Sequence, residues 1–159
     1  MMVLLPFLCL VVMGIVPFSQ DFMKSLKDEQ LHHLHLWRVP FAFVLLWFYQ
    51  SDVLPLDLTF EGINYDIIIG LTAPVVGSLA FSQKMLNKEI VLGWNAIGLV
   101  FLVISALLLW LDLQQNVKSI AAFTQLPYLL AFGFLFPASF YAHALAMYRI
   151  LKGDVKVSE

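Results

Sequence analysis

Charged residues are scarce in this sequence. Asp, Glu, Lys and Arg make up 13% of its 159 residues, about half the share in ordinary globular proteins. The net charge is −2 and no run of basic residues occurs. These two features remove the electrostatic case for nucleic acid binding, so we expect no nucleic acid partner.

Cysteine is almost absent as well. The single cysteine, Cys9, lies within an apolar stretch. No intrachain disulfide can form, and neither a cysteine metal motif nor the C-x-x-C-H motif of covalent haem attachment exists.

Apolar residues, in contrast, are abundant. They make up 61% of the chain, against roughly 45–50% in a typical soluble protein. A single soluble core of this size cannot bury so much apolar surface. The composition therefore predicts an all-α membrane protein, with residues 1–159 forming one integral membrane domain.

Five apolar stretches have about the length that a helix needs to cross a bilayer. They cover residues 3–18, 36–56, 65–81, 90–111 and 121–150. No Lys or Arg precedes the first stretch and no small-residue cleavage pattern follows it, which favours a membrane helix over a cleaved signal peptide. We therefore predict a bundle of five transmembrane helices.

The basic residues predict how these helices are threaded. Alternate connections and the C-terminal tail hold eight of the nine Lys and Arg residues: Lys24, Lys27, Arg38, Lys84, Lys88, Arg149, Lys152 and Lys156. The ninth is Lys118. Because cytoplasmic loops are enriched in Lys and Arg, we expect the N-terminus outside and the C-terminus in the cytoplasm.

Ionisable residues deep in a membrane usually mark function, and the five-helix prediction places no charged residue near the midplane. Arg38 opens the second helix, and His143 lies six residues before Arg149, at a similar cytoplasmic depth. We predict that Arg38 and His143 bind a ligand in one polar pocket that opens to the cytoplasm. The simpler alternative is that Arg38 only anchors its helix at the interface.

Three further candidate binding residues are Glu61, Asn64 and Asp66, which the prediction places at the outer face, away from that pocket. Oxygen-rich clusters can bind divalent cations, but the spacing matches no calcium loop. The alternative is that Asn64 caps the third helix and that Asp66 favours its dipole.

Histidines offer a different chemistry. His32 and His35 are three residues apart and would share a helix face, so one of them could hold a metal or a haem iron together with His143. The alternative is a hydrated cluster at the interface, with a histidine hydrogen-bonded to a neighbouring helix. Ser139 lies four residues before His143, but no acid is placed to orient the pair, and we predict no catalytic residue.

Several short motifs resemble a known family. They are W-R-V-P at 37–40, T-F-E-G-x-N-x-D at 59–66, G-L-T-A-P at 70–74, Trp94-Asn95, and Pro137 followed by Ala142-His143. Over about residues 37–150 the chain resembles a family of small uncharacterised multi-pass bacterial inner-membrane proteins. The resemblance implies the bacterial cytoplasmic membrane, and it implies no catalytic role because the family has no assigned activity.

Two functions follow as expectations. The first is a non-enzymatic integral membrane protein that binds a small ligand, a membrane protein partner or a second copy of itself within the bilayer, with no cofactor. The alternative is a b-type haem or quinone-linked electron-transfer subunit, which would use His143 with His32 or His35.

Overall fold

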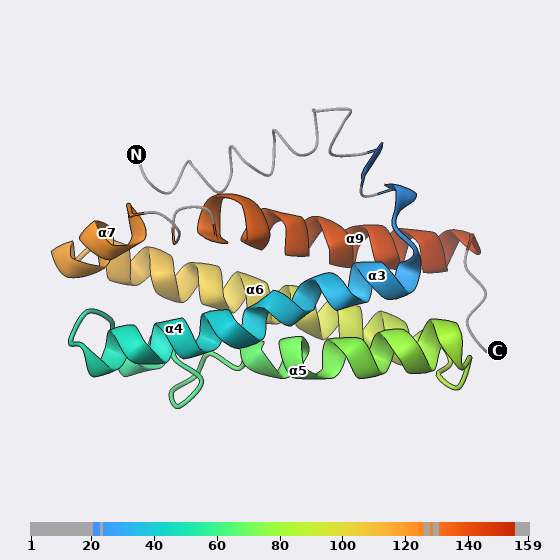
Figure 1. Cartoon of the computed structure of the whole chain (residues 1–159), viewed down its shortest axis with the longest axis horizontal. Helices are drawn as coiled ribbons and strands as arrows, with labels where there is room; N and C mark the ends of the chain where they lie inside the picture. The colour runs from blue at the N-terminus through green and yellow to red at the C-terminus, as the bar shows by residue number, and fades with distance from the viewer. Residues whose placement is uncertain (1–20, 23, 126–127, 129–130, 155–159) are drawn as a thin grey trace.

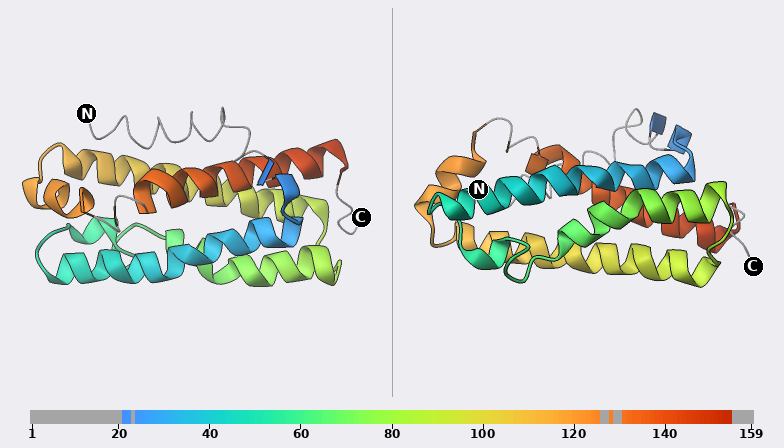
Figure 2. Two further views of the ribbon diagram at one scale, coloured as in Figure 1. Left: turned by 45° about the horizontal axis from the view of Figure 1, so that its top comes forward. Right: turned by 60° about the horizontal axis from the view of Figure 1, so that its bottom comes forward.

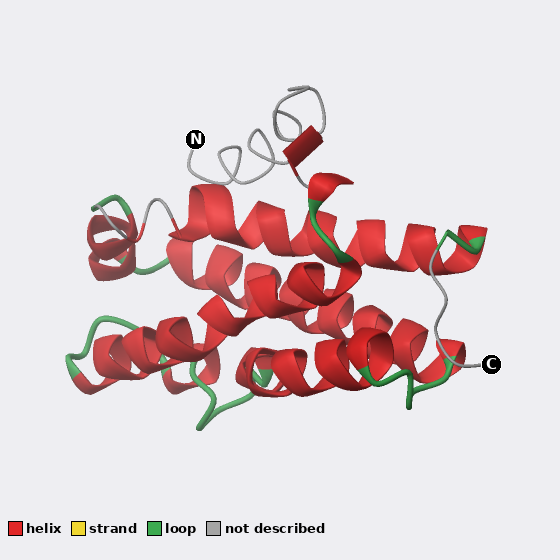
Figure 3. Cartoon of the chain, turned by 45° about the vertical axis from the view of Figure 1, so that its right-hand side comes forward, coloured by secondary structure: helices red, strands yellow, loops and turns green. Residues whose placement is uncertain are grey.

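The computed structural model describes residues 21–22, 24–125, 128 and 131–154, and over these ranges its regular structure is entirely helical. The long helices lie side by side along one axis (Figures 1 and 3). The first predicted helix, residues 3–18, lies outside the described residues, as does Cys9.

The described helical elements follow in chain order. They are α3 (Asp28–His33), η1 (Leu34–Trp37), α4 (Arg38–Gln50), η2 (Leu56–Leu58), α5 (Asp66–Gly77), η3 (Ser78–Ser82), α6 (Lys88–Leu113), α7 (Val117–Phe123), η4 (Ala131–Leu135) and α9 (Phe136–Lys152). The elements η1 and η2 are 3-10 turns, whereas η3 and η4 are π-helical. Helical backbone is continuous from α3 to α4, from α5 to η3 and from η4 to α9.

Helix α6 confirms the helix predicted at residues 90–111. Its N-cap is Asn87, whose side chain accepts a hydrogen bond from the backbone N–H of Ile90. The helix has 26 residues and is about 39 Å long at 1.5 Å per residue. Among the described helices only α6 is long and apolar enough to cross a membrane, so the prediction of five membrane-spanning helices is not supported.

The second predicted helix, residues 36–56, has different bounds. Helical backbone begins earlier, at Asp28, and ends earlier, at Gln50. Pro40 has no N–H for the carbonyl four residues before it, and the tighter turn η1 lies at this place. Asp52 then takes a left-handed conformation with φ of 55°, which turns the chain.

Residues 51–65 fold back along the bundle after this turn. Leu54 and Leu58 are buried in an apolar cluster with residues of α4 and α6. The Asn64 Nδ2 group donates a hydrogen bond to the Leu58 carbonyl. Helix α5 therefore begins at Asp66, beside the first residue of α4, and not at the end of the bundle.

The third predicted helix, residues 65–81, is confirmed as α5 with its extension η3. Its contact seam consists of small buried residues: Gly70, Ala73, Gly77 and Ala80. Small residues let helix backbones approach closely, and α5 packs against α3, η1 and α4 (Figure 2). A Cβ atom at Gly70 would lie 2.9 Å from Val39 Cγ2.

The prediction of a single helix at residues 121–150 is wrong. Helix α7 ends at Phe123, and Thr124 and Gln125 are not helical. The elements η4 and α9 form helical backbone from Ala131 to Lys152, before Gly153 with φ of 78°. Pro137 cannot donate to the carbonyl four residues earlier, which accounts for the π-helical turn η4.

Basic residues gather at one end of the bundle. There Arg149 Nη1 pairs with Asp28 Oδ1 at 3.0 Å, and Ser82 donates to Glu29. At the opposite end Lys118 Nζ donates to the Asp52 carbonyl. The described basic residues of the first end are Lys24, Lys27, Lys84, Lys88, Arg149 and Lys152. Arg38, which we assigned to a cytoplasmic connection, lies inside the bundle instead.

Candidate functional site

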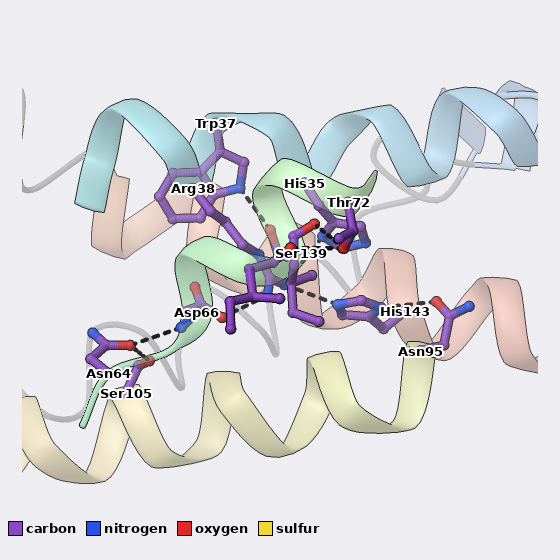
Figure 4. A network of polar contacts seen from close by, with 12 residues as sticks. His35, Trp37, Arg38, Asn64, Asp66, Thr72, Asn95, Ser105, Ser139 and His143 are labelled. Atoms are coloured by element: carbon purple, nitrogen blue, oxygen red, sulfur yellow. Dashed lines mark hydrogen bonds and ion pairs between the residues drawn. The ribbon is translucent and has the colours of Figure 1, made fainter. Parts of the chain in front are cut away.

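Arg38 forms an ion pair with Asp66 in the interior of the bundle (Figure 4). The Nη1 group of Arg38 lies 2.7 Å from Asp66 Oδ1, and the two side chains are 1% and 15% exposed. The prediction that Asp66 lies on the far side of the membrane from Arg38 is wrong. The physical reason is the folded-back segment 51–65, which starts α5 next to α4.

The pair lies near the middle of α6. Arg38 is hydrogen-bonded to His143, and the His143 ring lies against Gly98 of α6. Asp66, the first residue of α5, is hydrogen-bonded to Asn64. The Asn64 side chain in turn contacts Ser105 of α6. Both α6 positions are interior to that helix. The expectation that no charged residue lies at mid-depth is therefore wrong for this bundle.

Arg38 also binds two histidines, His35 and His143. Its Nη2 group lies 3.2 Å from His35 Nδ1 and 3.0 Å from His143 Nε2. A guanidinium group can only donate, so both ring nitrogens accept and both rings are neutral. The two rings stack with centroids 3.8 Å apart. The structure thus brings Arg38 and His143 together, although inside the bundle.

A chain of hydrogen bonds continues from His143 toward the basic end. The Nδ1–H group of His143 donates to Asn95 Oδ1 at 2.9 Å, and Asn95 Nδ2 donates to His32 Nε2 at 3.1 Å. His32 Nδ1 then donates to the Asp28 carbonyl at 2.8 Å. A ring nitrogen that accepts a hydrogen bond carries no proton, so the proton of a neutral ring must lie on the other nitrogen. These contacts therefore place the proton on Nδ1 in both His143 and His32.

A second branch leads from Asp66 into the folded-back segment. Asn64 Oδ1 accepts bonds from Ser105 Oγ at 2.8 Å and from the backbone N–H of Asp66 at 3.3 Å. The N-cap position of α5 is Tyr65, which makes no side-chain cap bond, so Asn64 acts from one residue earlier than a standard cap. Glu61 is exposed and its carboxylate lies outside this network.

Two members of the network, Asn95 and Ser105, were not predicted as site residues. Both are buried on α6, and the sequence signal that could have identified them is their heptad-like spacing with Gly98, which places them on one face of an apolar helix. Gly98 itself is required by the site, because a Cβ atom there would collide with the His143 ring.

A cleft lies beside the ion pair, and Arg38, Asp66, Asn64 and Ser105 contribute its polar lining. Its volume is about 20 Å³, which is room for a single water molecule.

The histidine arrangement bears on the haem alternative. Both ring nitrogens of His143 already take part in hydrogen bonds, and the ring of His35 lies flat against it. Iron ligation by His143 would require it to give up the bond with Arg38 or with Asn95. Among the described residues, no three His, Cys, Asp or Glu side chains are grouped to hold a metal ion.

No family model, curated protein or solved structure matches the chain. The resemblance to small bacterial inner-membrane proteins therefore depends on the motifs alone. The fold brings four of these motifs to one place: Arg38 of W-R-V-P, Asp66 of T-F-E-G-x-N-x-D, and the later residues Asn95 and His143 all belong to the network.

Proposed function

We propose that the protein is a non-enzymatic integral membrane protein that binds a small ligand within the bilayer, beside the ion pair of Arg38 and Asp66. The observation that carries the proposal is the buried ion pair at mid-depth of an apolar helical bundle. Charged groups are costly in such a place and are retained mainly where they serve a function.

The outer surface of the bundle supports a membrane location. Large apolar side chains are exposed along several helices, and on α6 they include Ile97, Val100, Val103, Leu107 and Leu111. Contiguous exposed apolar surface of this kind is uncommon on soluble monomers. The concentration of basic residues at one end supports a multi-pass protein of a bacterial inner membrane, with that end and the C-terminus in the cytoplasm.

The start of α5 supports a ligand site. Its first residue, Asp66, lies inside the bundle, and the preceding segment 51–65 is irregular backbone apart from η2. In membrane proteins, irregular backbone at depth is tolerated where protein or a cavity surrounds it, and half-helix ends of this kind form ligand sites in transporters. A small ligand fits this interior arrangement better than a partner protein, which would bind the outer surface.

Membrane disposition can be tested with fused reporters. A reporter that is active only in the cytoplasm should be active when fused after Lys88 or Glu159 and inactive when inserted near Asp57. Activity at Asp57 would contradict the orientation that we propose.

Ligand binding can be tested by native mass spectrometry of protein released from detergent after purification from membranes. We expect a small molecule to remain with the wild-type protein and to be lost in Arg38→Lys, because a point charge cannot replace the planar guanidinium group. Glu61→Gln, an exposed change in the neighbouring loop, is the matched control. Unliganded wild-type protein would contradict the proposal, and a Soret band in its absorption spectrum would favour the haem alternative.

A further inference from the structure

An apolar groove lies on the surface of the bundle between α6 and α9, which run side by side (Figure 1). Its volume is about 460 Å³, and its lining consists only of aliphatic and aromatic residues: Leu102, Val103, Ala106, Leu107, Trp110, Phe136 and Phe140. Four of these are 37–53% exposed: Phe140, Trp110, Val103 and Leu107. A molecule from the surroundings can therefore enter the groove from the side.

The groove follows one half of α6. It begins at Leu102, near the middle of the helix, and ends at Trp110, close to the last residue, Leu113. Eight residue steps of 1.5 Å correspond to about 12 Å, and half of the hydrocarbon core of a bilayer measures roughly 15 Å. Trp residues gather at membrane interfaces. In the proposed orientation the groove thus extends from the outer interface to mid-depth.

The width of the groove distinguishes between two kinds of occupant. Division of its volume by its length of about 12 Å gives a mean cross-section of about 38 Å², equal to that of a cylinder about 7 Å across. A helix with its side chains is about 10–12 Å across, so a helix of a second copy or of a partner protein does not fit inside. Non-bonded carbon atoms approach to about 3.5–4.0 Å, so a hydrocarbon chain does fit.

The lining also determines which part of a lipid can occupy the groove. No lining residue offers a charge, a hydroxyl or an amide group. A phosphate placed there would lose its hydration without a compensating partner, whereas methylene groups make van der Waals contacts with the Leu and Phe side chains. A lipid headgroup therefore belongs beyond Trp110, at the interface.

We infer that the groove binds an acyl chain of a membrane phospholipid, which lies along α6 with its methyl end near Leu102 and its headgroup beyond Trp110. Phe136 separates this chain from the water-sized cavity at Arg38, because it lines both spaces. The lipid site is therefore distinct from the polar centre. The inference rests on the proposed membrane location, and it does not depend on a ligand at the ion pair.

Native mass spectrometry in detergent, after addition of dioleoylphosphatidylglycerol, tests the site. We expect the wild-type protein to retain one phospholipid. Val103→Phe, which fills the groove from its rim, should lose it, whereas Val100→Phe, at an exposed residue of the same helix outside the groove, should retain it. Equal loss in both Val variants would overturn the inference. Arg38→Lys should retain the lipid as well, and its loss from folded Arg38→Lys protein would place the lipid at the polar centre instead.

The same experiment distinguishes the chain from the headgroup and from other occupants. Dioleoylphosphatidylethanolamine should bind as well as dioleoylphosphatidylglycerol, because only the acyl chain enters the groove; a strong preference for either headgroup would overturn the inference. Absence of lipid from the wild-type protein would overturn it in favour of the chain's own apolar segment 3–18. A dimer that Val103→Phe dissociates would overturn it in favour of a second copy.

A fluorescence measurement locates the chain without filling the groove. A phospholipid brominated in its acyl chains, added at one molecule per protein in excess detergent, should quench the emission of Trp110. The quenching should disappear in Trp110→Phe and remain in Trp47→Phe, whose exposed indole on α4 does not line the groove. Quenching that persists in Trp110→Phe would overturn the inference.

Discussion

The polar centre around Arg38 and the apolar cluster around Phe48 are both buried, but they hold the bundle together by opposite means. The apolar cluster consists of Leu45, Phe48, Leu54, Leu58, Leu109 and Phe123. Its contacts are individually weak and non-directional, so a neighbour can partly replace a lost one. In the polar centre each group needs its own partner, because an unpaired buried charge is far more costly than a lost methyl contact.

This difference assigns separate tasks to the two regions. The apolar cluster holds the folded-back segment 51–65 against α4 and α6. The polar centre fixes the place where α5 begins, since Asp66 must meet Arg38. We therefore expect loss of the counter-charge of Arg38 to cost more than loss of an apolar side chain.

The largest effect is expected for Asp66→Ala. The change leaves Arg38 buried without its counter-charge, which should lower the free energy of unfolding by about 3–5 kcal/mol, measured by denaturant titration in mixed micelles. The double variant Arg38→Met with Asp66→Leu should recover most of the loss, because it removes both charges together. Glu61→Ala serves as the control. An Asp66→Ala protein as stable as this control would contradict the distinction.

Leu54→Ala tests the apolar cluster. It creates a cavity at a residue that does not line the cleft and should cost about 2–5 kcal/mol in the same titration, while ligand binding by the folded fraction is retained. The control is Leu56→Ala in the same segment, since Leu56 is exposed. If Leu54→Ala abolished ligand binding while stability held, the two regions would not be separable.

Gly98→Ala tests the close approach of α9 to α6. The added methyl group would collide with the His143 ring, and overpacking of this kind costs typically 1–3 kcal/mol. The same change at Gly93, where a Cβ meets no atom within 4 Å, should be neutral or stabilise α6 by up to about 1 kcal/mol. Equal effects at the two glycines, in thermal unfolding, would show that His143 does not lie against Gly98.

The smallest effect is expected for Ser105→Ala. It removes one hydrogen bond to Asn64 and should cost about 0.5–1.5 kcal/mol, since Asn64 keeps its contacts with Leu58 and Asp66. A control is Ser25→Ala, whose hydroxyl binds an exposed local carbonyl. A loss for Ser105→Ala as large as that for Asp66→Ala would mean that the network acts as one unit.

The helical class and the helices near residues 65–81 and 90–111 could be predicted because the length and hydropathy of an apolar stretch are local properties of the sequence. The meeting of Arg38 and Asp66 could not, because it depends on the path of segment 51–65. Hydropathy treats the apolar residues of that segment as the end of one span and the start of the next. It cannot show that Leu54 and Leu58 pack back against α4 and α6, nor that α7 ends at Phe123 within an apolar stretch.

The candidate site could also be predicted only in part. Arg38 and His143 stood out because they are polar residues in apolar surroundings. Asn95 was not assigned to the site because an amide on a helix face also serves ordinary packing, and its role depends on bonding His143 on one side and His32 on the other.

The measurement that tests the polar centre most directly is ¹⁵N NMR of the histidine side chains in lipid nanodiscs at neutral pH. Hydrogen bonds donated by Arg38 and Asn95 predict neutral rings, with the proton on Nδ1 in His32 and His143 and on Nε2 in His35. In the Arg38→Met, Asp66→Leu double variant, His35 and His143 should no longer be held in these single tautomers. Wild-type rings that are protonated on both nitrogens, or that carry the opposite tautomers, would contradict a network centred on Arg38.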